Sequence, residues 1–118
     1  MNSKEAIIAF SQGEKIKSGL IWINQVLELA AGLSPQDTRG AEETIKALVH
    51  MLANEILLSQ KMAPDASWQE AAKHVDTALI MINSGVALDA TYHLTQALSQ
   101  VTGINQRSMS FLKEQALL

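Results

Sequence analysis

The sequence contains no cysteine, only two prolines and six glycines among 118 residues, and aromatic residues make up 4% of it. The absence of cysteine excludes disulfides, thiolate metal sites and thiol catalysis, and it is compatible with a reducing compartment. So few prolines and glycines leave little room for the many turns of an all-β fold. The apolar residues are mostly Leu, Ile, Val, Ala and Met, which fill helix–helix interfaces. We therefore expect an all-α protein.

A strong charge of either sign is also missing, because nine basic and twelve acidic residues give a net charge of -3. Lys15 and Lys17 are the nearest approach to a basic cluster, and no aromatic residue stands among the other Lys and Arg to stack on a base. Binding to nucleic acid requires several neighbouring cations that neutralise phosphates. We expect no nucleic-acid partner.

Long hydrophobic runs are absent as well. The longest strongly apolar, uncharged run, residues 77–88, is interrupted by Asn83, Ser84 and Gly85, whereas a membrane-spanning helix needs about 20 apolar residues. The start, MNSKEAII, lacks the basic and then apolar segments of a secretory signal. We expect a soluble, cytoplasmic protein with no membrane partner. Its length suffices for a single domain, residues 1–118, to bury a core without a metal or a disulfide.

The clearest element is the stretch SWQEAAKHVDTALIMINSG, residues 67–85. Ser67 and Glu70 have the spacing of a capping box, and Gly85 ends the stretch. Apolar residues recur within it every three or four positions, which indicates an amphipathic helix. These residues are Trp68, Ala71, Ala72, Val75, Ala78, Leu79 and Ile82.

Two longer helices precede this element. Asn2 is a suitable N-terminal cap and Gly32 a suitable C-terminal one, which predicts a first helix over residues 3–31. Ser34 and Pro35 predict the start of a second helix, which runs to about residue 62. At 1.5 Å per residue, each of these helices is about 40 Å long.

A fourth helix follows Gly85 and is expected to end at Gly103, with Asn105 capping a short C-terminal helix that ends near residue 115. The third and fourth helices are then about 25 Å long each. Tight junctions make consecutive helices antiparallel, so the expected fold is an antiparallel (up-down) four-helix bundle with two long and two shorter helices plus the short C-terminal one. The alternative is one helix over residues 67–103, which would give a three-helix bundle; the turn residues at 83–85 favour the first interpretation.

Periodicity also predicts the core. Gly13 and Gly19 lie within the first helix and mark either close approaches or a kink. After Ile104 the apolar seam of the fourth helix is lost, because Asn105 and Ser108 continue its line. The expected core residues of the first two helices are Ile7, Phe10, Ile16, Leu20, Ile23, Leu27 and Ala30, followed by Ala41, Ile45, Leu48, Leu52, Ile56 and Ser59.

The first helix carries a second apolar row, Trp22, Val26, Leu29 and Leu33. Two long helices cannot be covered along their whole length by two shorter ones, and the uncovered part would contain this row. Leaving each large side chain in water forgoes about 1.5–3 kcal/mol. We therefore predict that the row is an association surface, either for a second copy or for another helical protein. The alternative is that this half is simply the most buried part of a monomeric bundle.

Histidines are the main candidates for chemistry. Glu70 and His74, like Asp89 and His93, are four residues apart and could share a helix face as metal ligands, and His50 could supply a third imidazole. His50, however, is predicted to project away from the core, whereas a metal in a bundle core needs inward ligands. Solvent-facing pairs are the ordinary interpretation.

The string HMLANE, residues 50–55, and the later TYH, residues 91–93, resemble the metal helices of the DinB four-helix family. This resemblance covers about a dozen residues and implies metal binding. The family has two histidines four residues apart where this chain has Asp89 and His93, and its members are usually longer. Four-helix domains of this size also include histidine-phosphotransfer proteins, for which His74 or His93 would be the candidate, although the lysine and glycine pattern usual near the phosphorylated histidine is missing.

Other catalytic patterns are absent: there is no G-x-S-x-G motif and no glycine-rich phosphate loop. Glu55 falls inside the apolar arc of the second helix, where desolvation would raise its pKa unless its carboxylate reaches water at the rim. We assign no catalytic residue, no metal ligand and no cofactor. The sequence predicts a non-enzymatic bundle that acts through protein–protein association, most simply as a homodimer; the alternative is a metal-binding or phosphotransfer bundle that uses His50, His74 or His93.

Overall fold

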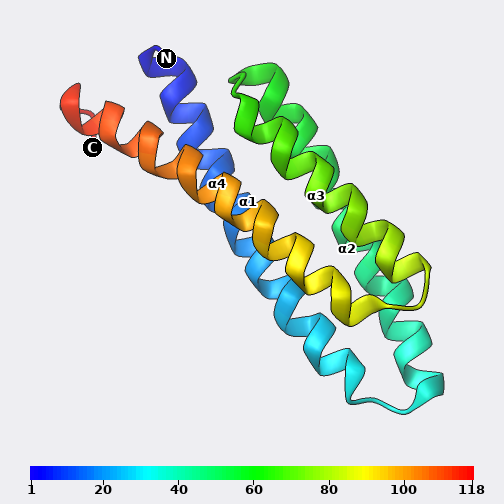
Figure 1. The fold of residues 1–118 in the computed structure, drawn as a ribbon. Coiled ribbons are helices and arrows are strands. Elements are labelled where there is room, and N and C mark those ends of the chain that lie inside the picture. The colour runs from blue at the N-terminus through cyan, green and yellow to red at the C-terminus, as the bar shows by residue number, and fades with distance from the viewer.

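A computed structural model describes all 118 residues. It contains four helices and no strand: α1 (Ser3–Ala31), α2 (Pro35–Met62), α3 (Ala66–Asn83) and α4 (Ala87–Glu114). Each helix packs against the next, and α4 also packs against α1, so that the four helices enclose one core (Figure 1). The molecule is elongated, 52 by 21 by 18 Å. The all-α, four-helix fold predicted from the sequence is confirmed.

The first two helices begin where their caps predict. Asn2 Oδ1 accepts a hydrogen bond of 2.8 Å from the Glu5 amide at the start of α1. Ser34 Oγ accepts one of 3.3 Å from the Asp37 amide at the start of α2. These bonds satisfy amides that have no partner within the helix. Local sequence therefore determines both N-termini.

The predicted capping box of α3 is wrong. Asp65 caps this helix, and its Oδ1 accepts a hydrogen bond of 2.8 Å from the Ser67 amide. Ser67 instead uses its hydroxyl to accept a bond from Arg107 of α4, and Glu70 pairs with Lys73 at 3.2 Å. Aspartate and serine are equally suitable N-caps. Because the Ser67 hydroxyl contacts Arg107 of α4, Asp65 is the residue that caps α3.

The turn between α3 and α4 is present, and the single helix over residues 67–103 is excluded. Gly85 has a φ of +81°, in the left-handed region that favours glycine. The amide of Val86 donates to the Met81 carbonyl at 3.0 Å and that of Gly85 donates to the Ile82 carbonyl at 3.2 Å. This is the bond pattern of a Schellman motif, which ends a helix sharply.

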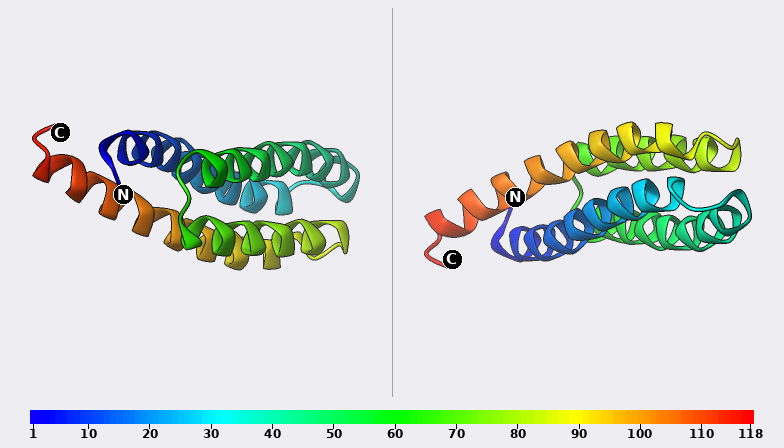
Figure 2. Two further views of the ribbon diagram at one scale, coloured as in Figure 1. Left: turned by 90° about the horizontal axis from the view of Figure 1, so that it is seen from above. Right: turned by 90° about the horizontal axis from the view of Figure 1, so that it is seen from below.

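The expected end of the fourth helix at Gly103 is wrong. The helix α4 continues to Glu114 and has 28 residues, as does α2, beside the 29 of α1 and the 18 of α3. Three helices are therefore long, and there is no separate C-terminal helix. Figure 2 shows α4 extending past the α2–α3 junction toward the chain termini. Asn105, Ser108 and Leu112 are buried there, so the loss of apolar character marks a change of packing partner rather than the end of a helix.

Both internal glycines of α1 are close approaches. A Cβ atom at Gly13 would lie 1.6 Å from Asn105 Oδ1, and one at Gly19 would lie 2.7 Å from Leu52 Cδ2. The first brings α1 against α4 and the second brings it against α2. Ile7, predicted to be in the core, is exposed. The small residues Ala6, Ala9 and Gly13 are buried instead, because only small side chains allow two helices to pack this closely.

The middle of the bundle follows the predicted apolar lines with one exchange. Leu48 of α2, expected in the core, is 41% exposed, whereas its neighbour Val49 is completely buried. Leu48 is on the predicted core line and Val49 is beside it, so the buried face of α2 is rotated toward Val49 relative to the prediction. The largest fully buried side chains include Trp68, Ile16, Leu20, Leu27, Ile45, Ile56, Ile82, Leu94 and Ile104.

A matched pair of glycine substitutions tests the close packing of α1. We expect Gly13→Ala to lower the free energy of unfolding by on the order of 1–3 kcal/mol, because the new methyl group overpacks the contact with Asn105. Gly40→Ala in α2 is the control: a Cβ atom there meets nothing within 4 Å, and alanine favours the helix by up to about 1 kcal/mol. Urea unfolding followed by circular dichroism measures both. Equal effects of the two substitutions would contradict the close approach at Gly13.

Candidate functional site

The apolar row predicted from the sequence is exposed. Trp22, Val26, Leu29 and Leu33 are 67, 39, 71 and 43% exposed, respectively. Their neighbours Ile23, Leu27 and Ala30 turn inward and are buried. The row therefore runs along the flank of α1, outside the core that α1 shares with α4.

The exposure of Trp22 and Val26 does not come from the expected shortage of helix length. The α3–α4 turn reaches the level of Ala30 and Glu42, since all of them line one pocket of about 230 Å³. The last turn of α1, the α1–α2 junction, which contains Leu33, and the first turns of α2 project past that turn (Figure 1). Trp22 and Val26 lie short of this end and are exposed because they are on the side of α1 that faces neither α4 nor the core.

A groove between α1 and α2 joins this row to exposed side chains of the second helix. It encloses about 300 Å³. Gly19 brings α2 close enough for Leu52 to contact α1 at this level. Leu48, predicted to be in the core, and Met51 extend the row onto α2, which periodicity along α1 did not predict. The lining residues are Lys15, Gly19, Trp22, Ile23, Val26, Leu48, Met51, Leu52 and Glu55; we call this surface the α1–α2 groove.

One end of the α1–α2 groove is closed by a polar cluster. Lys15 Nζ lies 2.8 Å from Glu55 Oε2, and Gln12 Nε2 donates to the same oxygen at 2.9 Å and to Ser59 Oγ at 3.0 Å. The hydrogen bonds from Lys15 and Gln12 lower the pKa of Glu55 more than desolvation raises it. A raised pKa was one of the two expectations for Glu55 and is wrong: its carboxylate stays charged and pairs with Lys15.

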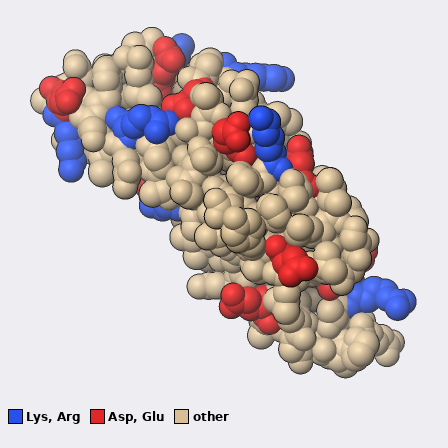
Figure 3. Space-filling model, in the orientation of Figure 1, with Lys and Arg blue, Asp and Glu red and all other residues tan.

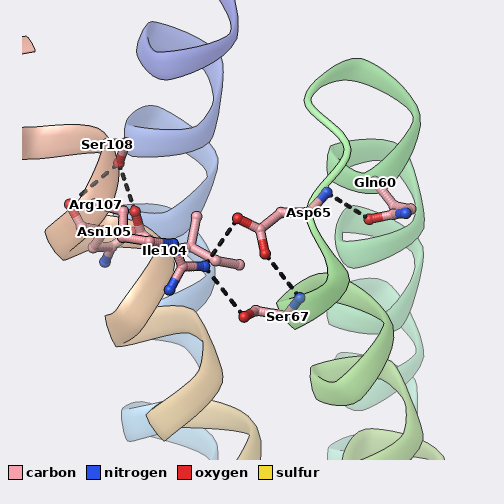
Figure 4. A network of polar contacts seen from close by, with 7 residues as sticks. All are labelled: Gln60, Asp65, Ser67, Ile104, Asn105, Arg107 and Ser108. Atoms are coloured by element: carbon pink, nitrogen blue, oxygen red, sulfur yellow. Dashed lines mark hydrogen bonds and ion pairs between the residues drawn. The ribbon is translucent and has the colours of Figure 1, made fainter. Parts of the chain in front are cut away.

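A second polar cluster fixes the start of α3 to α4 (Figure 4). Arg107 Nη2 donates to Asp65 Oδ2 at 2.9 Å and to Ser67 Oγ at 3.2 Å. The Asp65 amide donates to Gln60 Oε1 at 3.2 Å. Burial raises the pKa of Asp65, but the hydrogen bonds from Arg107 and from the Ser67 amide outweigh burial, so that the net pKa is lowered.

This cluster makes the free energy of unfolding depend on pH. A carboxylate with a lowered pKa stabilises the folded state above its ordinary value, 3.8 for Asp65, and that contribution is lost as the pH falls through the lowered value. We expect Asp65→Asn to reduce stability by about 1–2 kcal/mol at pH 7, since a hydrogen bond to a charged group is lost. The difference from the unmodified protein should shrink below pH 3.8.

Thermal unfolding between pH 2.5 and 7 measures this difference. Asp76→Asn is the matched control, because Asp76 is exposed and makes no ion pair. A difference for Asp65→Asn that stays constant over the whole pH range would show that the charge of Asp65 does not stabilise the fold.

Two of the three histidines lie together. The ring centroids of His74 on α3 and His93 on α4 are 6.0 Å apart, with 30° between the ring planes. Tyr92 packs edge-on against His93 at 5.2 Å, and the Nδ1 atom of His93 is buried with no hydrogen-bond partner. Periodicity could not show this pairing, because it depends on the register between α3 and α4.

The other predicted ligands do not complete a metal centre. His50 is exposed on α2, and no group of three His, Asp or Glu side chains lies close enough together to hold a metal ion. Glu70 is paired with Lys73. Zinc sites normally have three or four protein ligands, so the His74–His93 pair supplies fewer ligands than such a site requires.

The rest of the surface offers no concentrated charge on the side seen in Figure 3, where basic and acidic side chains are interspersed. No helix combines the length and the hydropathy that crossing a bilayer requires. Comparison with protein families, with curated proteins and with solved structures finds no match to this chain. Any functional inference therefore rests on the geometry of this molecule.

Proposed function

We propose that this chain is a non-enzymatic helical bundle, antiparallel and up-down, that acts through protein–protein association as a homodimer in the cytoplasm. The α1–α2 groove is the association surface. The observation that carries the proposal is the exposure of Trp22, Val26, Leu29 and Leu33 in one row beside Met51. A contiguous apolar surface of this kind is typical of an interface.

The contacts between the first two helices support the antiparallel arrangement. Gln12 bonds to Ser59, Lys15 pairs with Glu55, and the Thr38 hydroxyl donates to the Ala30 carbonyl. As the residue number rises along α1, the number of its partner on α2 falls. A junction of three residues between the two helices is short enough to enforce this direction.

The energy available from association is large. Burying one large apolar side chain contributes about 1.5–3 kcal/mol, and Trp22 and Leu29 are each about two-thirds exposed in the single chain. The groove carries one cation and one anion, Lys15 and Glu55, and these neutralise each other. A second copy presents the same apolar, internally neutral surface, so that no charge is buried without a partner.

Mass in solution tests the proposal. We expect twice the protomer mass in size-exclusion chromatography with light scattering, and we expect Trp22→Glu to give the protomer mass, because a carboxylate would have to be buried in the interface. Ile80→Glu is the matched control: Ile80 is 64% exposed but lies on α3, which does not line the groove. Protomer mass for the unmodified chain, or equal dissociation by both substitutions, would refute the proposal.

A second candidate function is favoured by the adjacency of His74 and His93. The ring centroids of the two imidazoles are 6.0 Å apart, and the pair would supply two of the ligands of a borderline cation such as Zn²⁺ or Ni²⁺, so that such a site would need further ligands from water or from another chain. The Nδ1 atom of His93 is buried and has no hydrogen-bond partner. Phosphotransfer by either histidine is the related alternative, and it would be recognised by acid-labile phosphate on His74 or His93.

Calorimetric titration with Zn²⁺ distinguishes these functions. Metal binding predicts one equivalent per chain, abolished by His93→Gln and unaffected by His50→Gln, since His50 is not part of the pair. Heat changes that are the same in all three proteins would assign any zinc affinity to other surface groups and would remove this candidate.

A further inference from the structure

The exposed apolar surface extends beyond the α1–α2 groove and runs diagonally across the two helices. It covers the C-terminal half of α1 from Trp22 onward and continues to Leu33 in the α1–α2 junction. On α2, Leu58 and Met62 are also exposed, and they share one helix face with Met51 because the steps of seven and four residues return to the same side. The apolar residues of α2 therefore continue toward its C-terminal end.

The α1 part and the α2 part of this apolar surface lie side by side only at the α1–α2 groove. Gly19 lies against Leu52, and Gln12 lies against Ser59. Leu58 and Met62 are therefore level with the first part of α1, while Leu29 and Leu33 are level with the first part of α2. The surface is a stripe with Trp22 and Met51 at its centre. We call this surface, made up of Trp22, Val26, Leu29, Leu33, Leu48, Met51, Leu58 and Met62, the diagonal stripe.

The centres of the two remaining corners of this face are polar. Ser11 is exposed on α1 on the same side as Trp22, and Thr44 is exposed on α2 on the same side as Met51. The spacings of eleven and seven residues place each pair on one helix face. The corner at Thr44 would gain nothing by being buried against an apolar surface. The corner at Ser11 carries one exposed apolar side chain, Ile7, four residues before Ser11.

We propose that two copies of the chain pack stripe against stripe, with the two-fold axis passing close to Trp22 and Met51. This inference rests on the proposed function and specifies the geometry of the same surface. In a symmetric interface each patch contacts its own equivalent, so a diagonal stripe can be covered completely only if the two bundles cross. Crossing leaves the corners at Ser11 and Thr44 outside the contact.

The dimensions and charges of the face suit this occupant. A stable interface buries about 800 Å² on each partner, and the molecule is 52 Å long and 21 Å wide, so that contact along most of the stripe is needed to supply that area. The charged residues beside the stripe centre, Lys15 and Glu55, are already paired at 2.8 Å. A strongly charged partner would find no counter-charge there, whereas a second copy offers a matching apolar stripe.

The absence of cysteine makes disulfide trapping a direct test. A Cα–Cα distance below about 7 Å is needed for a disulfide, so a single cysteine links two copies only when it lies close to the axis. We expect Met51→Cys to form a linked dimer on mild oxidation, within minutes and in high yield. Thr44→Cys, on the same face of the same helix, and Ser11→Cys on α1 should remain at least tenfold less linked.

Each outcome has one meaning. Equal linking of all three variants, or linking of Thr44→Cys alone, would overturn the position of the axis. If light scattering shows a dimer and Met51→Cys does not link, association occurs without this geometry, and the proposed function survives the loss of the inference. A protomer mass at every concentration would refute both. Circular dichroism of each variant checks that it is folded, which the exposure of all three positions favours.

Discussion

The fold depends on how closely α1 approaches its two neighbours. At Gly13 the backbone of α1 leaves space for Asn105 of α4, and at Gly19 it leaves space for Leu52 of α2. Any side chain at these positions would increase the distance between the helices, because protein interiors are packed to the density of organic crystals. The first contact holds the long end of α4 against the N-terminal half of α1. The second forms the floor of the α1–α2 groove.

These contacts also explain why an apolar row is left outside the core. The inner stripe of α1 is completely used by Ile16, Leu20, Ile23 and Leu27, which pack in the shared core. A four-helix arrangement offers α1 two neighbours, α2 and α4, and both contact it on this inner side. The flank that carries Trp22 and Leu29 is then left without a partner from the same chain. Its apolar character is the physical basis for the proposal that this chain acts through association.

Electrostatic interactions stabilise two local contacts between helices. The two carboxylates with lowered pKa, Glu55 and Asp65, each receive a hydrogen bond from a cation on another helix. Both clusters lie toward the end of the bundle that holds the α2–α3 junction, where α4 runs past α3 (Figure 2). Charged hydrogen bonds there hold Glu55 of α2 to α1, and Asp65 at the start of α3 to α4.

The sequence by itself determined the helical class, both N-terminal caps of the long first pair, the turn at Gly85, most of the core and the row from Trp22 to Leu33, because each depends on residues within a few turns of one helix. The tertiary structure alone decided the length of α4, the burial of Ala6 in place of Ile7, the exchange of Leu48 and Val49, the cap of α3 and the meeting of His74 with His93. Each of these depends on which helix lies opposite and in what register. Periodicity along a single helix contains no such information. A residue on the edge of an apolar stripe is buried only if the opposing helix covers it, whatever its position in the repeat.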